Sequence, residues 1–71
     1  MPRRLVVNGT KARRLRTKAR LTQEVAAVRI GIAASSLRRI EAGGESVQLR
    51  TVGKLADLYG VEPSELLQWV R

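Results

Sequence analysis

Apolar residues recur along most of this chain at every third or fourth position, the spacing of a helix that buries one face. The strongest stripe is formed by Leu49, Val52, Leu55, Ala56 and Tyr59. The same spacing predicts five helices, over residues 9–19, 22–30, 34–42 and 49–59 and from Pro63 onward. No strand of any length is needed to explain the pattern, so we expect an all-α fold of five short helices.

Residues at the ends of the predicted helices support these boundaries. Asn8 and Thr22 are suited to cap the first two helices, because their side chains accept hydrogen bonds from free N–H groups. Gly43 and Gly60 follow the third and fourth helices, where glycine commonly ends a helix. Gly53 lies inside the fourth helix at a cost of about 1 kcal/mol relative to alanine. We therefore expect a close packing contact that requires this glycine.

The chain has 71 residues, which is enough for one domain. The pattern divides it into an N-terminal arm over residues 1–8 and a helical domain over residues 9–71. In the arm, Leu5, Val6 and Val7 either add a short strand or pack on the core. Asn8 and Gly9 then break the chain.

The segment from Gln23 to Ile40 has the residue types that two steeply crossing helices require. Ala27 is small enough for the point where the helices touch, and Gly31 tolerates the left-handed backbone of a tight turn. Ile40 and other apolar residues close the core beneath the turn. The segment is therefore predicted to be a helix-turn-helix.

The charge is large and unevenly distributed. Lysine and arginine number 14 against six acidic residues, for a formal net charge of +8. Residues 1–40 hold eleven basic residues and a single acid, Glu24, whereas residues 41–71 carry a small negative net charge. One strongly basic half indicates a polyanionic partner, most often nucleic acid.

Composition excludes several other functions. The chain has no cysteine and no histidine, so it lacks thiolate chemistry and the usual zinc and acid–base residues. We expect no enzymatic activity, no cofactor and no metal. No apolar run is long enough to span a membrane, and the N-terminus lacks the apolar region of a secretory signal. The cytoplasm is the simplest compartment.

The whole pattern resembles the Cro/C1 repressor-like, or XRE-type, helix-turn-helix family over residues 9–67. The resemblance rests on Leu21 to Glu24, Ala27, Ile30 to Ile32 and Ile40 to Gly43, and it continues through Leu49, Thr51, Val52, Leu55, Ala56, Leu58, Gly60, Val61, Leu66 and Leu67. It implies a compact, lambda-repressor-like domain of five helices. It also implies sequence-specific binding of double-stranded DNA, commonly by a homodimer on a pseudo-palindromic operator.

The resemblance implies that the third helix enters the major groove with its N-terminal residues at the base edges. Those residues are Ala34, Ser35, Arg38 and Arg39. Arginine can hold O6 and N7 of guanine with two hydrogen bonds. We expect Arg39 to read a guanine, because its place in the family pattern faces the groove, and Arg38 to reach a phosphate.

The family also implies phosphate contacts at the start of the second helix, where Thr22 and Gln23 stand, and Ser36 adds a hydroxyl. Arg16 and Glu41 occupy places where the family often has a partly buried ion pair between helices. Arg20 replaces the glycine that commonly ends the first helix, so we expect a less tightly turned end.

The basic run over residues 11–20 contains no acid, so pairing along the helix does not explain it. It is either a solvated face or, as we expect for Arg13, Arg14 and Arg20, a phosphate-facing surface. Arg3 and Arg4 either form a flexible arm that follows a DNA groove or belong to a poorly ordered chain terminus.

Several apolar residues have two interpretations. Trp69 either covers the core or, with Leu66 and Val70, anchors a dimer. Val25 and Val28 are apolar where the family is usually polar, so they either turn inward or form an exposed patch for another protein.

These observations predict a regulator of transcription, most simply a repressor that occupies an operator. The alternative is a protein-interaction module, such as an antitoxin that binds a partner protein as well as DNA.

Overall fold

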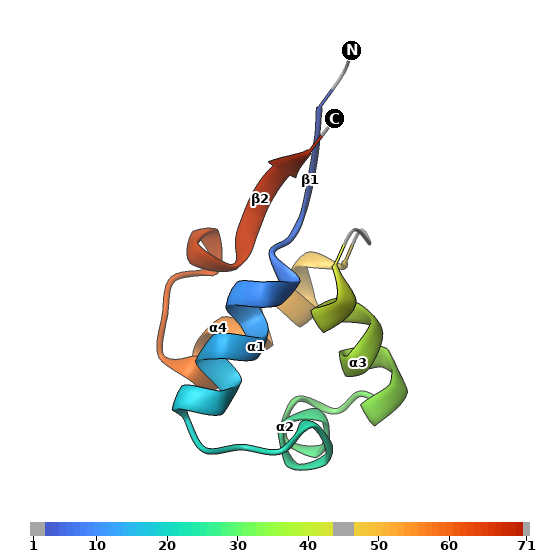
Figure 1. The fold of residues 1–71 in the computed structure, drawn as a ribbon, viewed down its shortest axis with the longest axis vertical. Coiled ribbons are helices and arrows are strands. Elements are labelled where there is room, and N and C mark those ends of the chain that lie inside the picture. The colour runs from blue at the N-terminus through green and yellow to red at the C-terminus, as the bar shows by residue number, and fades with distance from the viewer. Residues whose placement is uncertain (1–2, 44–46, 71) are drawn as a thin grey trace.

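The computed structural model describes residues 3–43 and 47–70, in which four α-helices enclose an apolar core. The two ends of the described chain form a small sheet that projects from the helices (Figure 1). In chain order the elements are strand β1 (Arg4–Val7), helices α1 (Gly9–Lys18), α2 (Gln23–Ile30), α3 (Ala34–Ala42) and α4 (Leu49–Tyr59), the 3-10 helix η1 (Pro63–Leu66) and strand β2 (Leu67–Val70).

The ends of the chain differ from the all-α prediction. The expected fifth helix from Pro63 is a single 3-10 turn, and the chain then becomes the strand β2. This strand pairs antiparallel with β1, with Leu5 opposite Trp69 and Val7 opposite Leu67. Of the two alternatives for the N-terminal arm, both are realised, because Val6 and Val7 belong to β1 and are also buried. The fold is therefore mostly helical, with a two-stranded sheet closing it.

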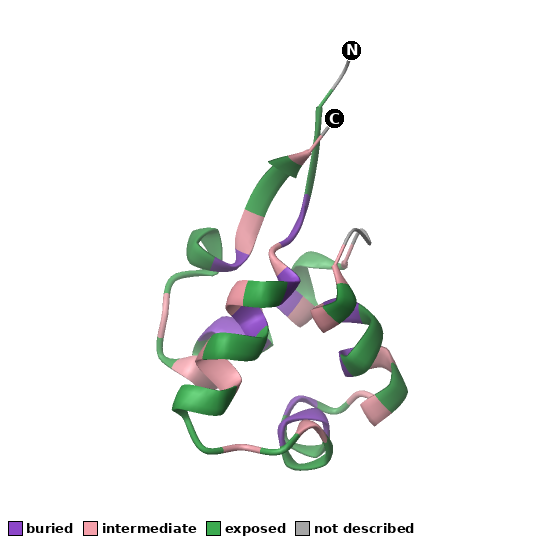
Figure 2. Ribbon diagram, in the orientation of Figure 1, coloured by how far each residue is buried: buried purple, intermediate pink, exposed green. Residues whose placement is uncertain are grey.

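The core lies where the four helices and η1 meet (Figure 2). Its largest fully buried side chains are Leu37, Leu55, Leu66, Val6, Val7 and Val52. They come from β1, α3, α4 and η1, and small buried residues on α1 and α2 allow each of these helices to pack closely against the core. The core fixes the orientation of α3 because its inward residues Leu37 and Ile40 are both buried.

The end of α1 is tightly turned, contrary to the expectation for Arg20. Arg20 adopts a left-handed backbone with φ of 61°. Its N–H donates to the Thr17 carbonyl at 2.9 Å, and the Leu21 N–H donates to the Arg16 carbonyl at 3.2 Å. This is the Schellman arrangement, which glycine usually provides. Arg20 therefore makes the turn at the steric cost of its Cβ.

The glycine that packing requires is Gly9 and not Gly53. A Cβ at Gly53 would meet nothing within 4 Å, so the predicted close contact in α4 is absent. A Cβ at Gly9 would meet the Glu41 carbonyl oxygen first and would lie only 2.7 Å from the Ile40 carbonyl oxygen. Gly9 thus lets the start of α1 pass directly against the end of α3.

Candidate nucleic-acid interface

The turn between α2 and α3 sets the position of the exposed helix α3. Gly31 ends α2 with a left-handed φ of 78°, and the Ile32 N–H donates to the Ala27 carbonyl at 3.0 Å. Ala27 is buried at the contact between the two helices, and Ile40 is buried on the inner face of α3. The three residues expected to build the helix-turn-helix therefore occupy the turn and the contacts beneath it.

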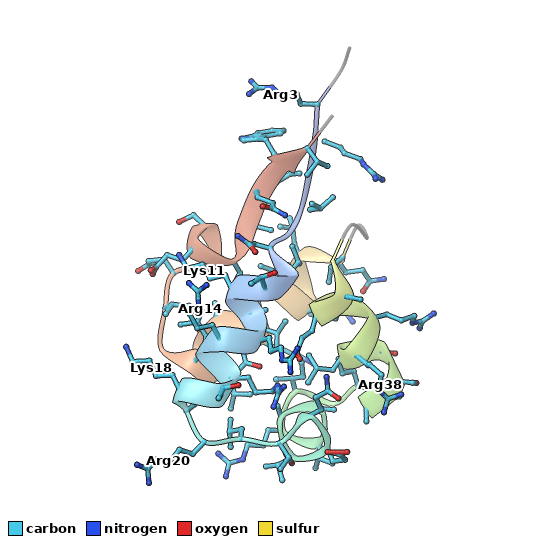
Figure 3. All side chains as sticks on the ribbon, in the orientation of Figure 1. Arg3, Lys11, Arg14, Lys18, Arg20 and Arg38 are labelled. Carbon is cyan, nitrogen blue, oxygen red and sulfur yellow. The ribbon has the colours of Figure 1, made fainter. Side chains whose placement is uncertain are left out.

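Helix α3 presents a polar face to solvent. Ser35, Arg38 and Arg39 are exposed, whereas Ala34 and Ser36 are half-buried. Figure 3 shows Arg38 extending outward from this helix. Neither Arg38 nor Arg39 pairs with a carboxylate among the residues that the structure describes. Both guanidinium groups are therefore available to an anionic partner.

The start of α2 offers main-chain N–H groups. The Thr22 hydroxyl caps the helix by accepting a hydrogen bond from the Val25 N–H at 3.1 Å. The first N–H groups of a helix have no partner within it, and the helix dipole is positive at this end. The Gln23 side chain is used internally, because its amide nitrogen donates to Glu41 Oε1 at 3.0 Å. Sequence reasoning missed this contact, since it joins two different helices.

Arg16 and Glu41 form the ion pair that ties α1 to α3. Arg16 Nε lies 2.7 Å from Glu41 Oε2, and Nη2 lies 3.1 Å from Oε1. Nη1 also donates to the Leu21 carbonyl at 2.8 Å. The side chains are 12% and 3% exposed, respectively. The hydrogen bond to Glu41 raises the pKa of Arg16, although burial lowers it.

Tyr59 borders this network from α4. Burial raises its pKa to about 12, the negative charge of Glu41 adds to the rise, and Arg16 opposes it. The hydroxyl is buried and makes no hydrogen bond to a described residue. Its position supports packing and gives it no direct route to a DNA phosphate.

The cations of α1 do not lie on one surface. Lys11, Arg14 and Lys18 lie on the side of α1 away from α3, opposite Arg38 (Figure 3). Arg13 lies three residues before Arg16, so helix geometry places it nearer the α3 side. Arg20 follows at the end of α1, where the chain turns toward α2 (Figure 3).

The N-terminal arginines are remote from the helix-turn-helix. Arg4 begins strand β1, so the arm is ordered by pairing with β2. The Arg3 guanidinium lies over the Trp69 ring, 5.3 Å from its centroid. Both residues lie where the sheet projects away from α2 and α3 (Figure 1). The structure therefore does not support a flexible arm that follows a groove beside α3.

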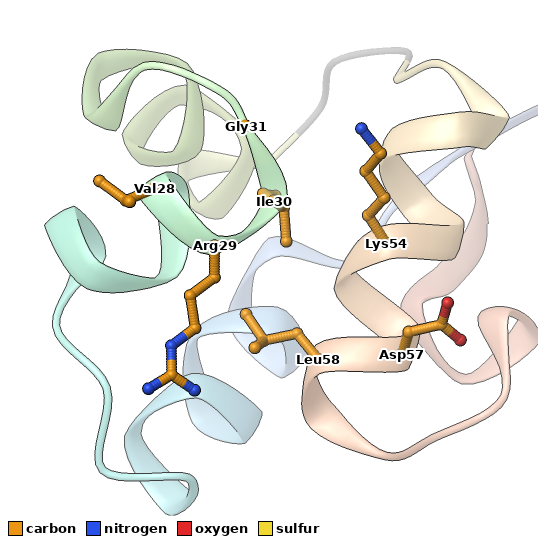
Figure 4. A pocket seen from close by; sticks show the side chains of 7 residues that line it. All are labelled: Val28, Arg29, Ile30, Gly31, Lys54, Asp57 and Leu58. Carbon is orange, nitrogen blue, oxygen red and sulfur yellow. The ribbon is translucent and has the colours of Figure 1, made fainter.

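The structure shows which of the apolar residues considered for contacts with another chain are buried and which are exposed. Leu66 is completely buried, so it cannot contact a second chain as predicted, whereas Trp69 is 59% exposed. Val25 and Val28 do not turn inward, and Val28 is 78% exposed. Figure 4 shows Val28 beside a groove between α2 and α4 that is also lined by Arg29, Ile30, Gly31, Lys54, Asp57 and Leu58.

The described residues contain no group of three or more acidic side chains that could hold a metal ion. None of the helices in residues 3–43 and 47–70 combines the length and apolar character needed to cross a membrane.

Comparisons with known proteins agree with this geometry. The family described as "Helix-turn-helix domain" matches residues 9–69. No curated protein matches the chain. Among solved structures, the chain is similar to the restriction-modification controller protein C.AhdI from Aeromonas hydrophila. The two share 37% identity with a TM-score of 0.74, over 80% of this chain and 86% of that chain.

Proposed function

The chain belongs to the helix-turn-helix family of DNA-binding transcriptional regulators, and from this premise we propose that it recognises a specific operator through α3. In this proposal α3 lies in the major groove, and the protein acts by occupying the site without catalysis. Occupation of a promoter by this domain excludes other proteins from it, which is the simplest way for a DNA-binding domain to repress transcription.

The exposed polar face of α3 is the observation that carries this proposal. Its inner face is buried through Leu37 and Ile40, and Glu41 ties it to α1, so its outer face has a fixed direction. We assign the base contacts to Ala34, Ser35 and Arg39, with Arg39 holding a guanine through O6 and N7. Arg38, one position earlier, is assigned to a phosphate beside the groove.

Phosphate contacts at the start of α2 position the helix. Thr22 and Gln23 contribute through the first main-chain N–H groups, because the Gln23 side chain is engaged with Glu41. We also assign phosphate contacts to the Ser36 hydroxyl and to the guanidinium groups of Arg13 and Arg20. The formal net charge of +8 adds long-range attraction to DNA, which weakens as salt increases.

A homodimer on DNA is the assembly that this mode of reading requires. A single α3 spans one half-site, and two copies related by a two-fold axis read a palindrome. Trp69 is the exposed aromatic residue that best suits a contact between copies, with half-buried Val70 beside it. Leu66 supports these residues from inside the core.

Selection of binding sites from a random duplex library tests this function. We expect a dyad-related consensus whose half-sites lie about 10 base pairs apart. Arg39→Ala should lose discrimination at one base pair of each half-site, whereas Arg38→Ala should weaken binding equally to all sequences. Recovery of no consensus, with only steep salt-dependent binding, would contradict operator recognition.

The exposure of Val28 favours a second candidate function, a contact with a partner protein through α2. A Val25→Ser, Val28→Ser variant tests it, because neither side chain belongs to the core cluster. Unchanged operator binding together with lost regulation in a reporter strain would support a protein contact. Unchanged regulation would contradict it.

A further inference from the structure

We propose that the outward face of α1 is a second phosphate-binding surface, through which the protein holds a second DNA duplex while α3 holds the first. The surface consists of Lys11, Arg14 and Lys18. This inference rests on the proposed function, because it assigns to the same protein a second contact with the same class of ligand.

The positions of the three cations on α1 are the first evidence for this surface. Their spacing of three and four residues places them in one row along α1. The helix contacts α3 through Gly9 and Arg16. At about 100° per residue, the row lies roughly 140–200° around the helix from those two residues. Figure 3 accordingly shows all three cations on the opposite side of the molecule from Arg38.

The row forms no ion pair among the residues that the structure describes. Residues 1–23 contain no acid, and the ion pair found among the described residues joins Arg16 to Glu41. The 3-10 helix η1 packs beside α1 and carries Glu62 and Glu65. Glu65 Oε2 accepts a hydrogen bond from the Glu62 N–H at 3.0 Å, and neither carboxylate forms an ion pair with the row among the described residues.

Repulsion among these charges opposes the stability of the helix that carries them, although the helix dipole favours Lys18 in the last turn. Like charges three and four positions apart repel each other on a helix surface. Lys11 lies in the first turn of α1, where the helix dipole disfavours a cation, and that turn contains no acid. If the row served only to keep the surface hydrated, acidic residues between the cations would make the helix more stable. Binding of a polyanion removes the repulsion, so the arrangement is suited to a ligand.

Dimensions and neighbouring residues favour duplex DNA as that ligand. Lys11 and Lys18 are separated by about 10 Å along the helix axis. B-DNA carries one phosphate charge per about 1.7 Å of its axis, so the row can face several phosphates. Sites for single strands also use aromatic side chains for stacking, and this row has none. The apolar face of α1 is directed to the core through Ala12, which leaves no apolar face for a membrane.

A capture assay tests the proposal. A short operator duplex is immobilised and saturated with protein, and a second, labelled duplex is added. The test variant is Lys11→Gln, Arg14→Gln, Lys18→Gln. The matched control, Arg29→Gln, Arg50→Gln, Lys54→Gln, removes the same charge from exposed positions outside the row. Circular dichroism establishes that both variants fold.

We expect both variants to bind the short operator duplex within about threefold of the original protein. The test variant should capture the second duplex at least tenfold less well, and the control variant should keep its capture. Equal capture by both variants, as when a dimer holds two duplexes through its two copies of α3, would overturn the proposal. So would a tenfold loss of operator binding in the test variant, since the row would then belong to the first interface.

The assay separates this inference from the proposed function. Binding of a preferred operator without capture of any second duplex overturns the inference and leaves the proposed function intact. Absence of any preferred sequence overturns the proposed function, and with it the inference.

Discussion

Replacement of Arg16 by methionine should remove a large part of the stability of this domain. Methionine keeps much of the apolar volume but leaves Glu41, whose side chain is 3% exposed, without its cationic partner. The variant loses the two hydrogen bonds to Glu41 at 2.7 and 3.1 Å and the one to the Leu21 carbonyl at 2.8 Å. Gln23 remains as the single side-chain donor to that carboxylate among the described residues.

The expected loss is about 3 kcal/mol. Removal of one partner from a buried pair costs about 3–5 kcal/mol, and the lower end applies because Arg16 retains 12% exposure and Gln23 remains. A domain of this size has a free energy of unfolding of roughly 4–11 kcal/mol. Each kcal/mol shifts the midpoint of a small domain by about 4–8 °C. The variant should therefore unfold at least about 12 °C lower.

Thermal and urea unfolding followed by far-ultraviolet circular dichroism measures this loss. Trp69 is a poor reporter because it is 59% exposed in the folded state. A double-mutant cycle with Glu41→Gln isolates the pair. We expect the double variant to be no less stable than Arg16→Met alone, because it leaves no unpaired charge. A loss below about 1 kcal/mol, or single effects that add within about 0.5 kcal/mol, would refute the ion-pair argument.

The remaining predictions concern stability and use the same unfolding assay. Gly53→Ala should stabilise α4 by about 1 kcal/mol, since its Cβ meets open space. Gly9→Ala should instead destabilise by about 1–3 kcal/mol, because its Cβ meets the Ile40 carbonyl. Arg20→Gly should stabilise the domain by about 0.5–1 kcal/mol. Glycine relieves the strain of the left-handed backbone, and the greater backbone freedom of glycine in the unfolded chain offsets part of that gain. Stability should fall as pH rises from about 10 to about 12, because Tyr59 deprotonates first in the unfolded chain, and Tyr59→Phe should remove that part of the fall.

The helices of this fold could be predicted because their signals are local. Helices α3 and α4 run over Ala34–Ala42 and Leu49–Tyr59, as the apolar spacing and the following glycines indicate. Thr22 caps α2 through its hydroxyl, a contact that involves residues three positions apart. In each case the residues that decide the structure are neighbours in the sequence.

Strand β2 was missed because its partner, β1, lies at the opposite end of the chain, whereas a short strand at Leu5 to Val7 was one of the two alternatives for the arm. Residues 67–70 are too short a run for spacing to distinguish a helix from a strand, and only pairing with β1 decides it. The close packing contact predicted for Gly53 is made by Gly9 instead, and this too could not be read from neighbouring residues. Gly53 drew attention inside a helix, whereas Gly9 is required by a carbonyl of α3 that is more than 30 positions away.

The candidate site was only partly accessible to sequence reasoning. The outward position of Arg38 and Arg39 follows from the buried positions of Leu37 and Ile40 on the same helix. The orientation of α1 could not be obtained that way, because its apolar stripe is narrow and consists largely of alanine. The structure consequently separates Arg14 from Arg38, although both belong to the basic half of the sequence.

The claim that α3 reads DNA sequence is tested most directly by a ratio of two affinities. These are the affinities of the protein for the selected operator and for a scrambled duplex, both measured at physiological salt. The account predicts a ratio of about a thousand or more for the original protein, since specific regulators commonly exceed their own non-specific binding by that factor. Arg39→Ala should lower the ratio by at least about thirtyfold, because the dimer loses one bidentate contact to guanine in each half-site, worth about 1–3 kcal/mol apiece. A ratio near one would contradict the account, because the net charge of +8 would then explain all of the binding.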